Sequence, residues 1–322
     1  MRGIFNILEK TQSLTSFFGS DYLDFEDWLH VDSMYRSRAL DLPGIGHCMV
    51  PCVDLANHAA GDDTVANYEK DADGDAVLLL REGKRVDVGA EVTITYGDEK
   101  GACEMLFSYG FFDDDAQSAE TLFLSLTIPN DDALQTVKMK ISNCPPGFKL
   151  IDTGDGGTEW TGDFIWLLCV NEDDGLRFET ARTVDGASEI EAFFRDDTLS
   201  GGAGQLHSLL SNTELWDVYR LRAITLLQQR VFDQLQALYT TQDDADTTPH
   251  GDGTDVREAP YGFAMTLRRL EFELMERAYE EFEMQKMQLA QSPVVVRYLA
   301  EMNEAPRPAS SGAVGEAEDD FS

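Results

Sequence analysis

The sequence has few positive charges, few cysteines and no long hydrophobic run. It contains 25 lysines and arginines against 60 aspartates and glutamates, which gives a formal net charge of −35. A field of this sign repels nucleic-acid phosphates and attracts basic partners. We therefore expect no direct binding of nucleic acid. Two explanations of the charge stay open: recognition of a basic protein, or the solvated acidic surface of a salt-adapted protein.

The five cysteines are scattered and odd in number. Cys48 and Cys52 have the spacing of a metal-binding pair, but no second pair follows to complete a tetrahedral site, so we expect no metal. Buried, reduced thiols fit an intracellular protein better. Residues 1–18 lack the apolar core of a signal peptide, and no segment approaches the roughly 20 apolar residues of a membrane helix. These features predict a soluble protein of the cytoplasm or nucleus.

The first third of the chain alternates helical and strand-like patterns. We predict a helix from Phe25 to about Leu40, because Asp24 can cap its start and Glu26 and Asp27 stand in its first turn. Strands are predicted at Ala76–Leu80 and Glu91–Tyr96, which glycine-containing turns separate. A short helix over Ala102–Tyr109 should end at the glycine that follows it. The run Asp113–Asp115 is predicted to mark a domain boundary.

The remainder of the chain is dominated by helical patterns. Thr121–Ile128 is predicted to be a strand or a buried segment. Two long amphipathic helices are expected, one over Glu214–Tyr239 and one over Phe263–Gln288. The polar residues Thr240–Ala259 should form a loop between these helices. Residues after Pro306 are small and acidic, which predicts a disordered tail.

The most informative segment runs from Met49 to His58 and contains the pattern P-x-x-D-x-x-N-H. Tyr96-Gly97 follows His58 by 38 residues at the end of a predicted strand, and Ser108–Phe111 then ends a short helix with Tyr-Gly-Phe. This order resembles the second half of SET-domain protein lysine methyltransferases, most closely the class typified by the Rubisco large-subunit methyltransferase.

Flanking segments extend the resemblance. Ser37-Arg38-Ala39 matches the element with which that class enters the motif, and the segments Asn212–Leu215, Tyr239–Thr241 and Leu267–Glu271 are similar to its helical substrate-binding domain. The likeness is sharp from Phe25 to Phe111 and loose beyond Ser118. It implies an α+β fold, with part of a SET domain in residues 1–112. That part combines short β-strands with a helical insert. A mostly α-helical substrate-binding domain would occupy residues 113–305, before a disordered acidic tail at 306–322.

The resemblance implies transfer of a methyl group from S-adenosyl-L-methionine to a lysine of a protein substrate, which we expect to be basic. The displacement requires amine, methyl and sulfonium in line, and a lysine kept neutral by desolvation. Tyr96 would place its hydroxyl beside the transferring methyl, and Tyr109 would wall the lysine channel. Both rings would also bound the cofactor pocket, where an aromatic face attracts a sulfonium.

The resemblance assigns four further residues to the cofactor. Asn57 and His58 would hold its amino-acid and adenine ends, and Arg38 would pair with its carboxylate through a charge-assisted contact. Asp54 would orient the loop or contact the cofactor. Taken singly, each residue has an ordinary structural explanation, such as a turn aspartate or a helix-terminal arginine. Their joint order favours the family.

The family's opening strands, with their Gly-x-Gly element, have no counterpart before Phe25. Gly44-Ile45-Gly46 follows a helix and is better explained as a turn. We therefore expect the chain by itself to bind the cofactor weakly or not at all, and its activity in this form stays open. Two other functions stay open: a non-catalytic module that grips a basic protein, and a purely structural acidic protein.

Overall fold

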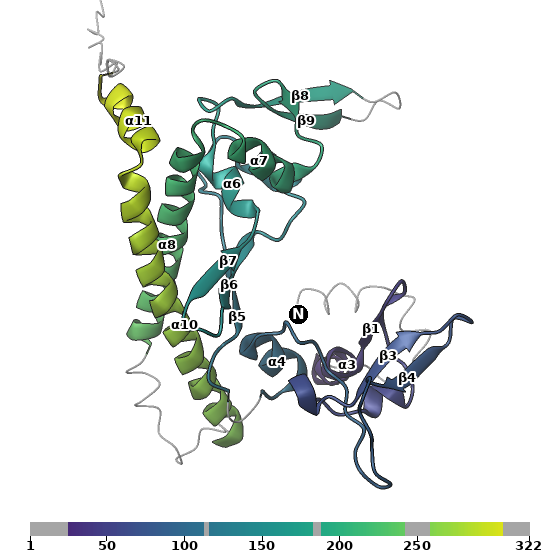
Figure 1. Ribbon diagram of the computed structural model, residues 1–322. Coiled ribbons are helices and arrows are strands. Elements are labelled where there is room, and N and C mark those ends of the chain that lie inside the picture. Colours follow the sequence, from purple (N-terminus) through teal and green to yellow (C-terminus); the bar gives the residue numbers. More distant parts are fainter. Residues whose placement is uncertain (1–24, 113–115, 183–187, 242–257, 305–322) are drawn as a thin grey trace, which may run out of the picture. The chain divides into compact units, whose positions relative to one another are not determined.

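The computed structural model describes residues 25–112, 116–182, 188–241 and 258–304 (Figure 1). The chain divides into two compact units. The first contains residues 1–122, 151–156 and 244–274, and the second contains residues 123–150, 157–243 and 275–322. Some of the predicted features lie outside the described residues. These are the segment before Phe25, the boundary at Asp113–Asp115, most of the predicted loop Thr240–Ala259 and the acidic tail.

The first unit begins with helix α3 (Phe25–Arg38), which matches the predicted helix except at its end. Strands β1 (Leu40–Leu42) and β2 (Gly46–Cys48) follow as an antiparallel hairpin. Gly44 has a φ of 77° in the connecting turn, a conformation that glycine adopts without steric cost. The expected turn at Gly44–Gly46 is therefore confirmed, although the hairpin itself was not predicted.

Two further strands and a helix follow in the first unit. Strand β3 (Ala66–Lys70) pairs antiparallel with β4 (Ala76–Leu80), whose bounds agree with the prediction. Helix α4 (Ala102–Tyr109) also has its predicted bounds, and Gly110 ends it in the left-handed conformation with φ 86°. Leu40, Ala66 and Ile94 form a small buried cluster, against which Val50, Val53 and Tyr96 pack.

The predicted strand Glu91–Tyr96 is wrong as a regular element. Ile94 alone forms an isolated parallel bridge, with His58. Ile94 N donates to Asn57 O and Ala59 N donates to Ile94 O, each at 3.0 Å, while Ala66 N donates to Thr93 O at 3.0 Å. The segment thus divides its hydrogen bonds between two neighbours and does not continue a ladder with either.

The second unit contains two three-stranded sheets and most of the helices. One sheet has the order β5–β6–β7, from Thr121–Ser125, Gly147–Asp152 and Thr158–Thr161. The other has the order β10–β9–β8, from Asp197–Thr198, Ser188–Phe194 and Leu176–Arg182. Strand β5 confirms the prediction for Thr121–Ile128 but ends three residues early.

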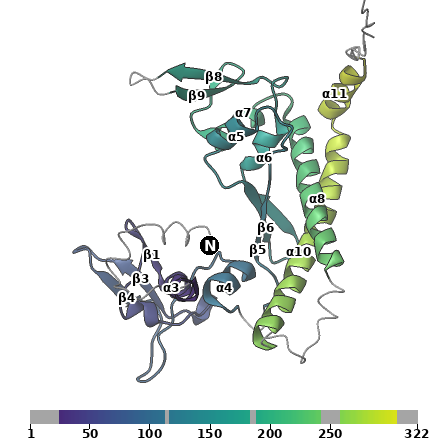
Figure 2. The same cartoon turned by 180° about the vertical axis from the view of Figure 1, so that it is seen from behind.

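The helices of this unit differ sharply in length. The shorter ones are α5 (Gln135–Ile141), α6 (Phe164–Cys169), α7 (Gly202–Ser211) and α11 (Pro293–Glu304). The long helix α8 (Trp216–Thr240) lies in this unit, whereas α10 (Glu258–Ala290) begins in the first unit and belongs to the second from Met275 onward. Both confirm the two predicted amphipathic helices. They lie side by side in both views (Figure 1, Figure 2). Gln228 meets Glu283 and Phe232 meets Tyr279, so the two helices run antiparallel.

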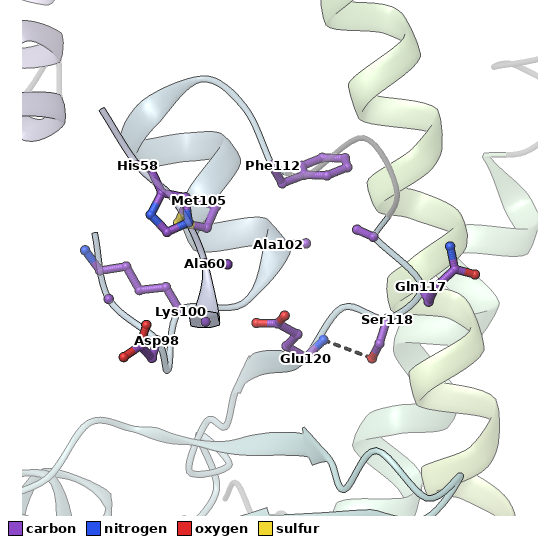
Figure 3. Close-up of a pocket in the computed structure, with 13 residues that line it drawn as sticks. His58, Ala60, Asp98, Lys100, Ala102, Met105, Phe112, Gln117, Ser118 and Glu120 are labelled. Atoms are coloured by element: carbon purple, nitrogen blue, oxygen red, sulfur yellow. Dashed lines mark hydrogen bonds between the residues drawn. The ribbon is translucent and has the colours of Figure 1, made fainter. Parts of the chain in front are cut away.

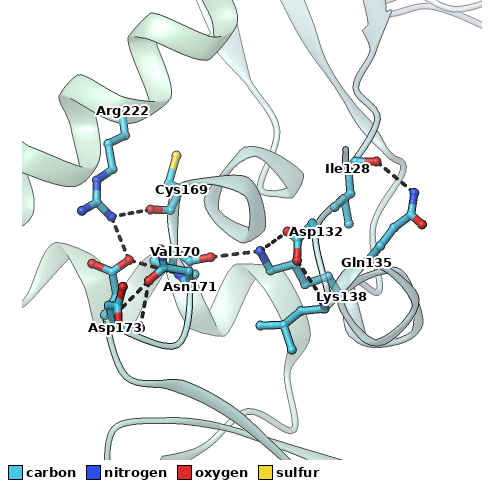
Figure 4. Close-up of polar contacts among 11 residues, drawn as sticks. Ile128, Asp132, Gln135, Lys138, Cys169, Val170, Asn171, Asp173 and Arg222 are labelled. Carbon is cyan, nitrogen blue, oxygen red and sulfur yellow. Dashed lines mark hydrogen bonds and ion pairs between the residues drawn. The ribbon is translucent and has the colours of Figure 1, made fainter. Parts of the chain in front are cut away.

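Helix α6 is the centre of the second unit's core, since five of its six residues are buried. A buried helix end must find donors for its last carbonyls. Arg222 donates to Cys169 O at 2.8 Å, and Lys138, only 2% exposed, donates to Val170 O at 3.0 Å (Figure 4). Both cations also meet carboxylates: Arg222 lies 2.8 Å from Asp174, and Lys138 lies 2.7 Å from Asp132.

Candidate active site

The loop that carries Asp54, Asn57 and His58 follows strand β2. A single 3-10 turn, η1 (Val53–Leu55), forms here, and Asp54 N donates to Val50 O at 3.0 Å. The chain then extends through Asn57–Ala59, where it brackets Ile94 with two backbone hydrogen bonds. Residues far apart in the sequence are therefore brought together by backbone contacts, and the side chains of His58 and Tyr96 meet as a result.

His58 and Tyr96 are joined by a directional hydrogen bond. The backbone N–H of Tyr96 donates to Nδ1 of His58 at 3.1 Å. Because an amide nitrogen can only donate, Nδ1 accepts, and the proton of the neutral imidazole lies on Nε2. The two rings are 5.2 Å apart between centroids. The contact fixes the orientation of the imidazole and leaves its Nε2–H as a donor.

Tyr96 and Tyr109 form an aromatic pair, with centroids 4.5 Å apart. The Tyr96 hydroxyl donates to Ala56 O at 2.9 Å, and the Tyr109 hydroxyl donates to Tyr96 O at 3.3 Å. Burial raises the pKa of the Tyr96 phenol above its ordinary value; Tyr109 adds to this effect, and the Arg38 guanidinium opposes it. The Tyr96 hydroxyl is therefore a protonated donor at neutral pH.

Two residues that the sequence did not single out belong to this group. Lys100 donates from Nζ to the Tyr109 hydroxyl at 2.5 Å, and its ammonium lies 4.8 Å from the centre of the Tyr109 ring. Phe111 has its ring centroid 6.1 Å from that of His58 and 6.4 Å from that of Tyr96. Phe111 lies within the Tyr-Gly-Phe motif, so its sequence signal was present. Lys100 lies between motifs and carried none.

Arg38 and Asp54 form an ion pair at 3.7 Å at the edge of the same region. The Arg38 side chain is 37% exposed and Asp54 only 12%. Asn57 is exposed, and its side-chain amide donates to Glu91 at 2.5 Å. Asn57 precedes His58 directly in the chain, but the side chains of Arg38 and Asn57 already have protein partners.

A cavity of about 470 Å³ lies beside His58, entirely within the first unit. Figure 3 places His58, Lys100 and Asp98 on one side of it and Gln117 and Ser118 on the other. Its further lining residues are Ala60, Gly61, Gly97, Ala102, Met105, Phe112, Ala116 and Glu120. Of the six site residues expected from the sequence, His58 lines this cavity, whereas Arg38, Asp54, Asn57, Tyr96 and Tyr109 do not.

All five cysteines are free. Cys169 is buried and burial raises its pKa to about 12, but Cys48, Cys103 and Cys144 are only partly buried and Cys52 is exposed. The expectation of buried thiols thus holds for Cys169 alone.

Within the described ranges, no cluster of three or more His, Cys, Asp and Glu side chains is arranged to hold a metal ion. None of the described helices combines the length and apolar character needed to cross a membrane.

Comparison with known proteins gives one curated relative and several solved structures. The chain is 29% identical over 204 residues to SET domain-containing protein 8 of Schizosaccharomyces pombe, which covers 63% of this chain and 46% of that protein. No protein-family model matches. The chain therefore spans less than half the length of this curated relative.

Solved structures of Rubisco LSMT are similar to this chain. A crystal structure of its SET domain with lysine and AdoHcy matches with a TM-score of 0.55 and 18% identity, over 88% of this chain and 61% of that one. Rubisco LSMT bound to AdoMet matches with a TM-score of 0.50 and 16% identity, over 89% and 61%. At this level of identity the likeness concerns the fold. The expected α+β class, with short strands in small sheets and many helices, is confirmed.

Proposed function

We propose that this chain, which is SET-domain methyltransferase-like in sequence and fold, provides the methyl-transfer site of a protein-lysine N-methyltransferase dependent on S-adenosyl-L-methionine. The observation that carries the proposal is the contact of His58, Tyr96 and Tyr109 beside a cavity. These residues come from the three segments on which the resemblance rests. Residues 1–112 would form the SET part, and residues 113–305 would bind the protein substrate.

The residues of the first unit fit such a cofactor in three respects. The cavity of about 470 Å³ lies within the roughly 300–1,000 Å³ of small-molecule sites. The Nε2–H of His58 is oriented by its contact with Tyr96 and can donate to a polar group of a ligand. Arg38 is partly exposed, and its ion pair with Asp54 is long, at 3.7 Å, so its guanidinium can also reach a carboxylate.

The chemistry places separate demands on the two tyrosines. The cofactor, when bound, supplies an electrophilic methyl group on a sulfonium. Tyr96 keeps its phenol protonated, and the phenol oxygen positions the methyl group and the incoming amine. Tyr109 supplies an aromatic wall that excludes water, which favours the neutral form of the lysine amine. Lys100 lies over the Tyr109 ring, where a cation is already accommodated in this structure.

The acidic composition supports a basic protein as the substrate or partner. A net charge of −35 favours encounter with a basic protein, in which lysines are frequent. The same observation favours the second candidate function, a non-catalytic module that grips a basic protein. The free cysteines fit a reducing compartment, so we place the protein in the cytoplasm or nucleus.

Replacement of Tyr96 by Phe tests the proposal. The change removes one hydroxyl and keeps the ring that packs against Tyr109, so the folded structure should persist. In a form of the protein that also carries the opening strands of the family, turnover should fall by roughly 30- to 1,000-fold with little change in cofactor affinity if the hydroxyl acts in the transition state. The assay is transfer of labelled methyl from the cofactor to the proteins of a lysate, with Tyr68→Phe as the matched control.

The outcomes separate the two functions. Equal labelling by wild type and Tyr96→Phe would contradict the role of Tyr96. No labelling by a folded wild-type chain that binds the cofactor, together with capture of a basic protein, would favour the binding module.

A further inference from the structure

A second cavity, of about 340 Å³, lies entirely within the second unit. The chain contains four tryptophans, and Trp160, Trp166 and Trp216 all line this cavity. The other lining residues are Thr161, Gly162, Asp163, His207, Arg220, Ala223, Ile224 and Gln285. We call this site the tryptophan cavity. None of its residues belongs to the candidate active site, so it requires its own explanation.

The aromatic rings form a connected group around Trp166. Trp166 is only 3% exposed and forms the buried floor. Its ring centroid lies 6.0 Å from that of Trp160 and 5.0 Å from that of Trp216. His207 stacks on Trp166 at 4.5 Å with an interplanar angle of 17°. Trp160 and Trp216 are only partly buried, so parts of both rings remain accessible beside the floor.

Tight backbone approaches hold these elements together. Trp160 lies on β7, Trp166 on α6, His207 on α7, and Trp216 begins α8. Gly162 joins β7 to α6 with a φ of 152°, and a Cβ there would lie 2.8 Å from Gly147 O. The close approach of Gly162 to Gly147 thus restricts how β7 leads into α6, the two elements that carry Trp160 and Trp166.

The cavity contains a carboxylate next to the aromatic faces. Asp163 Oδ1 lies 3.1 Å from Nδ1 of His207, and the Asp163 side chain is 43% exposed. Gly204 leaves room for this carboxylate, because a Cβ at Gly204 would lie 3.2 Å from Oδ2. Arg220 is the one Lys or Arg among the described residues that line the cavity, and Asp217 accompanies it at 3.6 Å.

We propose that the tryptophan cavity binds a methylated ammonium group, as carried by a methylated lysine side chain of a basic protein. Tryptophan faces attract cations more strongly than other rings, and quaternary ammonium groups are the ligands that aromatic cages recognise. Asp163 supplies the counter-charge. The same carboxylate and the net charge of −35 disfavour anionic ligands such as phosphates and carboxylates.

This site goes beyond the proposed methyl transfer and does not depend on it. Binding to the tryptophan cavity involves only residues of the second unit and requires no cofactor. A protein with both activities would hold a modified lysine at one place while acting at another. Because the binding test omits the cofactor, its failure would leave the proposed enzyme unaffected.

The test is a calorimetric titration of the full chain with three blocked amino acids: trimethyllysine, unmodified lysine, and the neutral analogue with a tert-butyl group in place of trimethylammonium. We expect trimethyllysine to bind about tenfold more tightly than either of the others, since only it combines a cation with a large, weakly hydrated surface. Equal binding of the neutral analogue would show ordinary apolar burial and overturn the proposal. Absence of binding at millimolar concentrations would also overturn it.

Variants locate the binding. Trp160→Leu should weaken binding of trimethyllysine about tenfold, Trp160→Phe should retain part of the affinity, and Asp163→Asn should weaken it about threefold. Trp28→Phe, in α3 of the first unit, is the matched control and should leave binding unchanged. Each variant must keep the wild-type circular dichroism and melting temperature. Unchanged affinity in folded Trp160→Leu would place the ligand elsewhere and contradict the assignment.

Discussion

The two units of the chain hold their candidate functional side chains by different physical means. In the first unit the buried cluster around Ile94 is small, and hydrogen bonds such as that from Tyr96 N to His58 set the geometry. In the second unit α6 buries five of its six residues, and cations close its carboxyl end. Directional contacts should therefore decide activity in the first unit, whereas burial should decide stability in the second.

The largest expected effect concerns the buried lysine of the second unit. Asp132→Asn removes the carboxylate that faces Lys138 at 2.7 Å and leaves a cation that is only 2% exposed. Removing one partner of a buried pair costs about 3–5 kcal/mol, and partial exposure of Asp132 should keep the loss near the lower value. Denaturant unfolding measures this loss in the free energy of unfolding. The control is Asp131→Asn, at the exposed neighbouring position.

The same pair predicts a dependence on pH. Burial raises the pKa of Asp132, but hydrogen bonds from Lys138 and from the Leu134 N–H outweigh it, and the net pKa is lowered. A carboxyl with a lowered folded-state pKa stabilises the protein above its unfolded-state pKa. This contribution is lost as the pH falls through the folded-state value. The Asp132→Asn difference should thus be constant near neutrality and shrink in acid; a difference that grows in acid would contradict the assignment.

An intermediate effect is expected at the first unit's loop. Asn57→Ala removes the amide that donates to Glu91 and that the family resemblance assigns to the cofactor. We expect the affinity for S-adenosylhomocysteine to fall about fivefold, equivalent to about 1 kcal/mol for one hydrogen bond, with little change in stability because Asn57 is exposed. Asn67→Ala, at an exposed position of β3, is the control in a calorimetric titration. Equal affinities of the two variants for S-adenosylhomocysteine would show that Asn57 does not contact the cofactor.

The smallest expected effect is a change in stability at Glu271, which lies in the first unit. Burial raises the pKa of Glu271, and the hydrogen bond from the Cys103 thiol only partly opposes it. When the pKa of a glutamate is higher in the folded than in the unfolded state, ionisation of that glutamate destabilises the fold. The protein therefore loses stability as the pH rises from the unfolded-state pKa to the folded-state pKa. Glu271→Gln should therefore raise the melting temperature slightly at neutral pH, and the gain should disappear near pH 4. A lower melting temperature at neutral pH would show that the charged form is favoured.

Much of the fold could be predicted where local pattern and tertiary structure agree. The bounds of β4 and α4 were predicted because an apolar run or helical spacing ended at glycines. No element was predicted over residues 130–204, where helices and strands are short, such as α5 over Gln135–Ile141 and β7 over Thr158–Thr161. The strand predicted at Glu91–Tyr96 has suitable β-branched residues, but its backbone partners are divided between two segments.

The candidate site was predictable only in part. The motifs singled out His58, Tyr96 and Tyr109, which the structure brings into contact. The sequence could not place Lys100 over Tyr109, and it could not show that Arg38 pairs with Asp54. The tryptophan cavity was missed for the same reason: Trp160 and Trp216 are 56 residues apart, and only the tertiary fold brings them to Trp166.

The most direct test of the central claim uses the histidines as reporters. The chain has five, and His58 and His207 lie in the two different cavities. Imidazole proton resonances, assigned with His58→Gln and His207→Gln, would be followed while S-adenosylhomocysteine is added, because NMR registers even weak binding. The account predicts a saturable shift of the His58 resonance and none for His207. A saturable shift of the His207 resonance with the His58 resonance unchanged would contradict the claim that the first unit holds the cofactor site.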